Sequence, residues 1–245
     1  MVPPMPPDFE ELDYQETPLG TLILRRRRLR SLDNLEVYEI ILGEGYLMSS
    51  LFTTVEIALA NLALALLPAE KKELSVAVGG LGLGYTAHAA LKDSRVSELV
   101  VVEALPEVIG WHRRELVPLG KEIHNDPRCR LIEGDFFSLA AGQGFDPGKP
   151  GRCFDAILLD IDHSPRNLIH ERHQGFYSLS GLRHLRSFLY PTGIFAMWSD
   201  DPPDENFEDL LREAFPLTES RIVTFPNPLQ GIESKSTVYL ARGSD

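Results

Sequence analysis

The chain has 245 residues, a length that suits a single α/β domain built around one large core. Its 36 acidic residues outnumber 24 basic ones and give a net charge of −12 at pH 7, so phosphates would be repelled. This charge argues against general nucleic-acid binding and against binding to a membrane surface. The two cysteines, Cys129 and Cys153, offer neither a disulfide framework nor a metal-binding spacing, which predicts a cytoplasmic protein without a bound metal.

The first part of the chain predicts a tail followed by a small β structure. It begins with MVPPMPP, which has neither the basic start nor the apolar core of a signal peptide, and we expect a disordered, proline-rich tail over residues 1–12. Residues 13–52 contain two extended segments, 20–30 and 36–49, and predict a β-hairpin or meander. The arginine run at residues 25–28 favours an exposed edge strand that its charges protect from further pairing.

Residues 53–245 alternate between strand-like and helical segments, the pattern of an α/β domain with a mostly parallel sheet and helices on both faces. The first helix covers about 13 mostly apolar residues, too few to span a bilayer, which takes ~20, and we expect it to be buried. The last two strands form a hairpin. The expected strands are 74–78, 98–103, 129–133, 155–160, 194–198, 221–225 and 237–241, and the expected helices are 54–67, 85–92, 107–116, 175–189 and 205–214.

A glycine-rich turn follows the strand at 74–78. Gly79, Gly80, Gly82 and Gly84 lie between this strand and the next helix, where glycines let the backbone approach a ligand. About 20 residues later a second apolar strand ends in Glu103, which is placed to accept hydrogen bonds from a ribose diol. These features predict a nucleotide-type cofactor.

The spacing of the glycines favours one cofactor class. Gly80, Gly82 and Gly84 give G-x-G-x-G, typical of transferases that use S-adenosylmethionine-type donors. The dinucleotide fingerprint places its third glycine where this chain has Tyr85, so a dehydrogenase is disfavoured. A tight strand–helix turn in any α/β protein remains the alternative explanation for the glycines.

Asp135 and Phe136 follow the strand at 129–133, at the edge where α/β sheets bind ligands. The carboxylate could accept a hydrogen bond from the adenine amino group, with the phenyl ring against the base. The alternative is that Asp135 only caps the next helix.

A second polar cluster follows the buried strand near residue 160. Asp160, Asp162 and His163 place two carboxylates and an imidazole at the end of this strand. Such groups could bind a cationic amine and remove its proton, so that the nitrogen lone pair attacks an electrophilic carbon. The alternative is that Asp160 caps a turn before Pro165 while His163 is merely exposed.

His170 and His173 are three residues apart and could share a helical face. No carboxylate or cysteine at matching spacing accompanies them, so no metal site is expected. We expect both to be solvated polar residues.

Together these motifs resemble the polyamine aminopropyltransferases, the spermidine synthase family. The resemblance covers most of residues 15–242. It rests on the glycine loop at 79–84, V-V-E at 101–103, G-D at 134–135, D-A-I-L-L-D at 155–160, F-Y at 176–177 and F-P-N-P at 225–228. It implies a class I methyltransferase-like (Rossmann-like), mostly parallel seven-stranded sheet with helices on both faces, preceded by a small N-terminal β segment.

The resemblance also implies a chemistry. Family members pass the aminopropyl group of decarboxylated S-adenosylmethionine to a diamine, and they suggest a small-molecule acceptor and a homodimer for this chain. By resemblance, Glu103 would hold the ribose, Asp135 the adenine, and Asp160 would be the base, with Asp162 or His163 assisting. The residues expected along the nucleotide are Gly79, Gly80, Gly82, Gly84, Glu103, Ala104, Asp135, Phe136 and Asp160.

The chain departs from the family pattern in the motifs for the amine. Gly82 stands where the family's glycine loop has an aspartate, and Met48 replaces the glutamine of the family's D-G-x-x-Q. The family's D-S-S-D-P becomes D-I-D-H-S at 160–164. Aminopropyl transfer to an amine is therefore the first hypothesis. The second is S-adenosylmethionine-dependent methylation of a small molecule, and the third is a non-catalytic nucleotide-binding relative that acts through protein partners.

Overall fold

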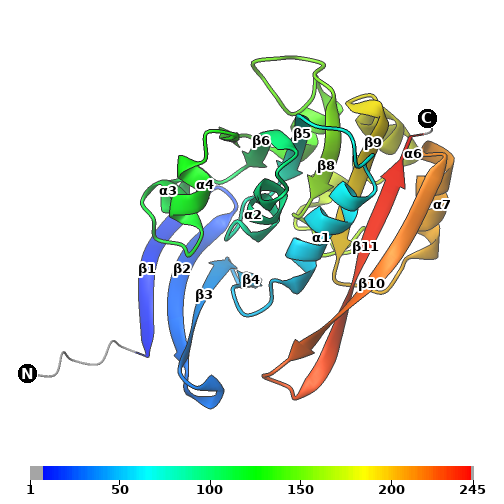
Figure 1. Ribbon diagram of the computed structural model, residues 1–245. Helices are drawn as coiled ribbons and strands as arrows, with labels where there is room; N and C mark the ends of the chain where they lie inside the picture. The colour runs from blue at the N-terminus through cyan, green and yellow to red at the C-terminus, as the bar shows by residue number, and fades with distance from the viewer. Residues whose placement is uncertain (1–7, 244–245) are drawn as a thin grey trace, which may run out of the picture.

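The computed structural model describes residues 8–243, which form two β-sheets with helices packed around the larger one (Figure 1). The N-terminal sheet is antiparallel, in the order β1-β2-β3-β4. It has four strands rather than the two expected extended segments, because the segment at 36–49 divides at a turn into β3 and β4 and because β1 adds a further strand. Its strands are β1 (Phe9–Thr17), β2 (Gly20–Leu29), β3 (Leu35–Leu42) and β4 (Gly45–Ser49), with a short 3-10 helix, η1 (Arg30–Leu32), between β2 and β3.

The first strand begins earlier than expected. Because β1 starts at Phe9, the prediction of a disordered tail over residues 1–12 is wrong for residues 9–12, while residues 1–7 lie outside the described residues. Glu10 pairs in register with Arg26, and their side chains form an ion pair. Asp13 accepts a hydrogen bond from the indole Nε1 of Trp111 at 2.6 Å. Partners far along the chain thus stabilise this strand.

The arginine run lies on an interior strand, so the prediction of an exposed edge strand is wrong. β2 pairs with β1 on one side and β3 on the other. Arg25 and Arg27, which share a face, both donate to the carboxylate of Glu39, at 2.5 and 2.8 Å. Burial alone would raise the pKa of Glu39, but these hydrogen bonds outweigh it and lower the pKa. Acidic residues on the neighbouring strands therefore neutralise the run.

The larger sheet has the order β10-β11-β9-β8-β5-β6-β7, with β11 antiparallel to both β9 and β10 and the other neighbours parallel. This confirms the predicted seven-stranded α/β architecture. Its strands are β5 (Leu74–Gly79), β6 (Val96–Glu103), β7 (Cys129–Glu133), β8 (Phe154–Leu159), β9 (Leu189–Ser199), β10 (Leu217–Asn227) and β11 (Ile232–Arg242). The helices are α1 (Thr54–Ala65), α2 (Tyr85–Lys92), α3 (Pro106–Arg113), α4 (Gly120–Asn125), α5 (Phe136–Ala141), α6 (Leu179–Arg186) and α7 (Glu205–Ala214), and a 3-10 helix, η2 (Glu171–Gly175), precedes α6.

Two hydrophobic cores cover the two faces of this sheet. Successive residues of a strand point to opposite faces, so Val76 and Val78 join one core while Ala77 joins the other. The first core contains side chains of α1, α2 and α3, and the second contains those of α5, α6 and α7. The apolar α1 is therefore buried on the sheet, as its sequence predicted.

One predicted helix is shorter than expected. The helix expected over 175–189 is reduced to α6, since the chain forms η2 first and β9 already begins at Leu189. Asp162 accepts hydrogen bonds from His173 and Tyr177, and these bonds keep the segment before α6 separate from that helix. The Ser178 hydroxyl then caps α6 by accepting from the Gly181 N–H.

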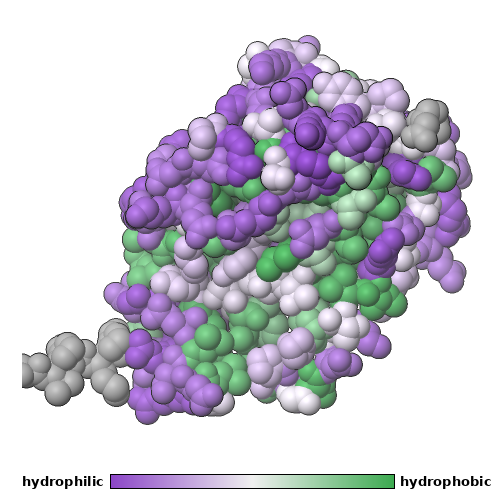
Figure 2. All heavy atoms as spheres, viewed as in Figure 1, coloured by the Kyte–Doolittle hydropathy of each residue, from purple (hydrophilic) through white to green (hydrophobic). Residues whose placement is uncertain are grey.

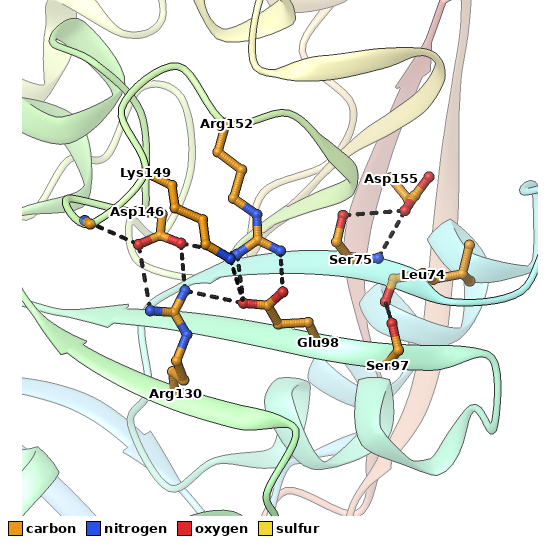
Figure 3. Close-up of polar contacts among 10 residues, drawn as sticks. Leu74, Ser75, Ser97, Glu98, Arg130, Asp146, Lys149, Arg152 and Asp155 are labelled. Atoms are coloured by element: carbon orange, nitrogen blue, oxygen red, sulfur yellow. Dashed lines mark hydrogen bonds and ion pairs between the residues drawn. The ribbon is translucent and has the colours of Figure 1, made fainter.

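A polar network fastens the loop at 142–153 to the start of β6, as Figure 3 shows. Arg152 binds the Glu98 carboxylate at 2.6 and 2.7 Å, and Arg130 lies 2.5 Å from Asp146. Because Glu98 and Glu103 lie near opposite ends of β6, this network lies at the amino-terminal edge of the sheet. It leaves the carboxyl edge free for a ligand.

The face drawn in Figure 2 has hydrophobic residues across its middle and lower part and hydrophilic residues along its upper and left parts. Exposed apolar side chains include Tyr46 on β4, Ile57 on α1, and Ile222 and Ile232 on the final hairpin. Among residues 8–243, no helix has the length and apolar character needed to cross a membrane.

Candidate functional site

A cavity of about 550 Å³ lies at the carboxyl edge of the larger sheet. Its floor includes residues that follow β5, β6 and β8, and its opposite wall comes from β3 and β4 of the N-terminal sheet, including Leu42, Tyr46 and Met48. Parallel α/β sheets bind ligands at this edge because loops from neighbouring strands diverge there. The N-terminal sheet thus closes a crevice that the larger sheet opens.

Two of the four predicted glycines line this cavity, Gly80 and Gly82, whereas Gly79 and Gly84 lie behind the lining. Gly80 has a φ of +90°, and a Cβ there would lie 2.2 Å from the backbone oxygen of Asp160. No side chain fits in that space. The glycine is therefore required for the loop to pass beside the end of β8.

Glu103 faces the cavity and holds the glycine loop. Its carboxylate accepts hydrogen bonds from the N–H groups of Leu81 at 3.0 Å and Leu105 at 2.9 Å. Burial raises its pKa, although these donors pull in the other direction. Both Glu103 and Ala104 line the cavity. Binding of a ribose by Glu103 stays a prediction, and the structure adds a role in shaping the loop.

Three other N–H groups of the loop at 80–84 also have partners within the protein. Leu83 donates to the Met48 sulfur at 3.1 Å, Gly80 to the Val102 oxygen at 2.9 Å, and Gly84 to the Leu81 oxygen at 2.7 Å. The N–H groups of Gly80, Leu81, Leu83 and Gly84 are therefore already paired within the protein. Sequence analysis missed Met48 as a loop partner, because only tertiary packing brings β4 to this loop.

Asp135 lines the cavity and also caps α5. Its Oδ1 accepts from the Ser138 N–H at 2.6 Å, and its Oδ2 accepts from Arg172 at 2.9 Å. Burial would raise the pKa of Asp135, but the Ser138 hydrogen bonds and the Arg172 charge lower it. Asp135 therefore caps α5, as the alternative explanation holds, and its carboxylate is also partly exposed at the cavity. Phe136 is 1% exposed and stacks on Phe145 at 4.5 Å, so its ring lies deep in the cavity floor.

Asp160 faces the cavity opposite a second carboxylate, that of Glu56 on α1. The Thr86 hydroxyl donates to Asp160 Oδ2 at 2.6 Å. Burial and the negative charge of Asp160 raise the pKa of Glu56 to about 8, and burial raises the pKa of Asp160 to about 6, against the hydrogen bond from Thr86. Two carboxylates so placed do not both ionise without a cation nearby.

Sequence analysis did not single out Glu56 as a site residue. The available signal was a lone carboxylate within an otherwise apolar helix, at residues 55–67. A charged residue there must either reach solvent or find a partner. In the folded protein the Glu56 side chain lines the cavity instead.

His163 and Asp162, both predicted site residues, occupy different environments. His163 lines the cavity, with its ring 6.2 Å from that of Trp198. Asp162 is 3% exposed and lies outside the lining, where it accepts from the Ile169 N–H at 2.7 Å and the Tyr177 hydroxyl at 2.9 Å. The Asp162 carboxylate therefore does not line the cavity itself, but it is hydrogen-bonded to two residues that do, Ile169 and His173.

The prediction that His173 is solvated is wrong. Its side chain is 6% exposed, its Nδ1 lies 2.9 Å from Asp162, and its ring stacks on Phe137 at 3.8 Å. The buried carboxylate and the aromatic ring draw the imidazole inward. His170, in contrast, is exposed at the cavity, as expected.

The lining of the cavity is acidic. Four carboxylates face it, those of Glu56, Glu103, Asp135 and Asp160. Arg172 is the one arginine or lysine among the described lining residues, and Asp135 already pairs with it. The electrostatic potential inside therefore favours a cationic ligand.

Known proteins with this architecture were found by comparison. No protein-family model matches the chain. A polyamine aminopropyltransferase from Prochlorococcus marinus (strain MIT 9313) is 29% identical over 138 residues, which make up 56% of this chain and 44% of that protein. The match thus spans less than half of the relative's length.

Solved structures match almost the whole chain. Spermidine synthase from Thermotoga maritima has a TM-score of 0.69 and 16% identity, covering 96% of this chain and 73% of the other. The fold is that of spermidine synthase. A spermidine synthase in complex with the transition-state analogue AdoDATO has a TM-score of 0.70 and 16% identity, covering 96% and 74%. A probable spermidine synthase from Corynebacterium glutamicum ATCC 13032 has a TM-score of 0.66 and 17% identity, covering 95% and 80%.

Within the spermidine synthase fold, this chain has distinct residues at the positions that the resemblance gives to amine recognition. Met48 and Gly82 lie against each other: a Cβ at position 82 would be 2.4 Å from the Met48 sulfur. An apolar contact therefore occupies a place where the resemblance expects an aspartate and a glutamine. The carboxylate of Asp160, which the resemblance also expects, lines the cavity near the end of β8 together with that of Glu56.

Proposed function

We propose that this protein is a transferase that binds a decarboxylated S-adenosylmethionine-type donor and passes its aminopropyl group to an amine acceptor. The observation that carries the proposal is the pair of carboxylates, Glu56 and Asp160, that face one cavity at the carboxyl edge of the sheet. A cationic amine between them would satisfy both charges, since each carboxylate alone is raised in pKa by burial.

The charge of the cavity supports a donor that lacks a carboxylate. S-adenosylmethionine and its decarboxylated form share a sulfonium and an ammonium group, but only the first carries a carboxylate. The carboxylates of the lining that are ionised would repel that group, and the N–H groups of Gly80, Leu81, Leu83 and Gly84 already have protein partners. An unpaired charge taken out of water costs several kcal/mol, roughly, so the decarboxylated donor is favoured.

Asp160 would act as the base. The acceptor ammonium gives its proton to a carboxylate oxygen, and the freed nitrogen lone pair attacks the donor carbon bonded to sulfur. The new C–N bond forms as the C–S bond breaks, and the bonding electron pair stays on sulfur to give a neutral thioether nucleoside. A carboxyl with a pKa of about 6 can exchange a proton near neutral pH. Holding donor and acceptor in line would supply much of the remaining acceleration.

Methyl transfer is the second candidate, and the contact between Met48 and Gly82 favours it. This contact leaves that part of the lining without a polar side chain for the donor's amino group. Both donors carry this amino group, but a methyltransferase does not transfer the aminopropyl group and so needs no side chain that positions that group for attack. The two candidates differ in whether the donor's carboxylate is accepted.

Calorimetry with three ligands tests the proposal: S-adenosylmethionine, its decarboxylated form and 5′-methylthioadenosine. We expect the decarboxylated donor to bind at least roughly tenfold more tightly than the carboxylated one. Preference for the carboxylated donor would favour methyl transfer, and binding of all three without turnover on any amine would favour a binding module. Glu56→Gln should reduce the preference, and the matched control Glu70→Gln, an exposed acidic residue outside the cavity, should leave it unchanged.

A further inference from the structure

A buried carboxylate–imidazole pair adjoins the cavity on the side of α5. Asp162 accepts three hydrogen bonds, from the Ile169 N–H at 2.7 Å, the Tyr177 hydroxyl at 2.9 Å and His173 Nδ1 at 2.9 Å. Burial and the charge of Asp162 raise the pKa of Tyr177 well above its usual value, so the phenol stays a donor. Every partner of the carboxylate is therefore a donor.

This arrangement determines which nitrogen of His173 carries the proton. A carboxylate offers only lone pairs, so Nδ1 must be the protonated nitrogen of the neutral ring. Nε2 then presents a lone pair. This atom makes no hydrogen bond to any residue in the range 8–243, it is not sealed from solvent, and His173 lines the cavity.

His173 lines the same part of the cavity as Asp135. The ring of His173 stacks on Phe137, two residues beyond Asp135, with 3.8 Å between centroids. Arg172, the residue before His173, reaches Asp135 at 2.9 Å. The segment η2 thus packs against the start of α5, and two side chains that can accept hydrogen bonds, Asp135 and His173, both line the cavity at this contact.

We propose that His173, oriented by Asp162, is a specificity-determining residue whose Nε2 accepts a hydrogen bond from the exocyclic amino group of an adenine ring. The inference rests on the proposed function, which places a nucleoside in this cavity. An amino group has two N–H donors, one for Asp135 and one for His173. A 6-oxo purine would instead turn its oxygen lone pairs toward two acceptors, which leaves that oxygen and His173 Nε2 without a donor and places the oxygen beside the Asp135 carboxylate. These two side chains therefore select 6-amino over 6-oxo purine nucleosides.

The test compares calorimetric binding of 5′-methylthioadenosine with that of 5′-methylthioinosine, its 6-oxo counterpart. The wild-type protein should prefer the amino compound by roughly tenfold or more. His173→Phe keeps a ring to stack on Phe137 but removes the acceptor, and it should lower that ratio by roughly tenfold. The melting temperature of each variant verifies that the protein is folded under the assay conditions.

A second variant tests the proton position. In Asp162→Asn the amide can donate to Nδ1 and move the ring proton to Nε2, which then becomes a donor. Binding of the 6-oxo compound should strengthen relative to that of the amino compound. Tyr177→Phe is the matched control, because it removes a hydrogen bond to Asp162 but keeps the carboxylate, and its ratio should equal that of the wild type.

The outcomes separate the two proposals. If the wild-type protein binds neither nucleoside, the proposed function fails and the inference fails with it. If it binds 5′-methylthioadenosine but His173→Phe keeps the wild-type ratio, the inference is overturned while the proposed function stands. A ratio that changes as much in Tyr177→Phe as in Asp162→Asn would also overturn it, because loss of packing would then explain both.

Discussion

The sulfur of Met48 fills the space into which a side chain at position 82 would extend, 2.4 Å from where a Cβ would lie. The same sulfur accepts the N–H of Leu83 at 3.1 Å. The N-terminal sheet and the glycine loop are therefore coupled through one thioether. A change at either position alone leaves a clash or a gap.

Gly82→Ala should destabilise the protein by about 1–3 kcal/mol, because the new methyl group meets the Met48 sulfur and φ is +47°. Met48→Ala opens that space, so the double variant should be less destabilised than the sum of the single variants. Urea unfolding of all four proteins measures the coupling. Additive changes in the free energy of unfolding would show that the two side chains do not compete for one space.

Asp160→Asn should lower the turnover number by about 10²–10⁴-fold, because the amide cannot take the proton of the acceptor. Its affinity for 5′-methylthioadenosine should change little, since the neutral nucleoside needs no base. A transfer assay with the decarboxylated donor and a diamine measures the first, and calorimetry the second. Unchanged turnover would exclude Asp160 as the base.

The free energy of unfolding without ligand should fall between pH 5 and 8. The native pKa of Glu56 is about 8, above its ordinary value of 4.5, so in this range the folded protein binds more protons than the unfolded chain. Stability from this group is complete below about pH 4.5 and is lost as pH rises through 8. Glu56→Gln should flatten the pH dependence by on the order of 1–3 kcal/mol.

Urea unfolding at several pH values checks this dependence. Glu70→Gln, on the protein surface, serves as the control and should keep the wild-type slope. A wild-type slope in Glu56→Gln would mean that another group takes up the proton.

Glu39→Gln should destabilise the protein by about 1–3 kcal/mol, because Arg25 and Arg27 lose their shared carboxylate. Glu36→Gln removes an exposed partner of Arg26 and should cost no more than about 0.5 kcal/mol. Thermal unfolding compares the two. Equal effects would contradict the assignment of the buried carboxylate as the centre of this charge network.

Much of the architecture could be predicted from local patterns. The run of short apolar segments between helical ones indicated the sheet, and Gly80, Gly82 and Glu103 indicated the edge at which the cavity lies. The predictions were wrong where contacts between residues distant in the sequence determine the secondary structure and the strand order. β1 begins at Phe9 because β2 and Trp111 offer it partners, and β2 is interior because β1 exists.

The sequence by itself determined the alternation of strands and helices after residue 53 and the ends of β6 and β7, because hydrophobic periodicity and glycine conformations act over a few residues. Only the tertiary structure decided which side chains meet at the cavity. Glu56 opposes Asp160, Met48 fills the space beside Gly82, and Asp162 orients His173. The partners in the first two pairs are distant in the sequence, and in the third a turn reverses the chain. The energies of these three contacts depend on burial and on interatomic distances, which a local sequence pattern does not specify.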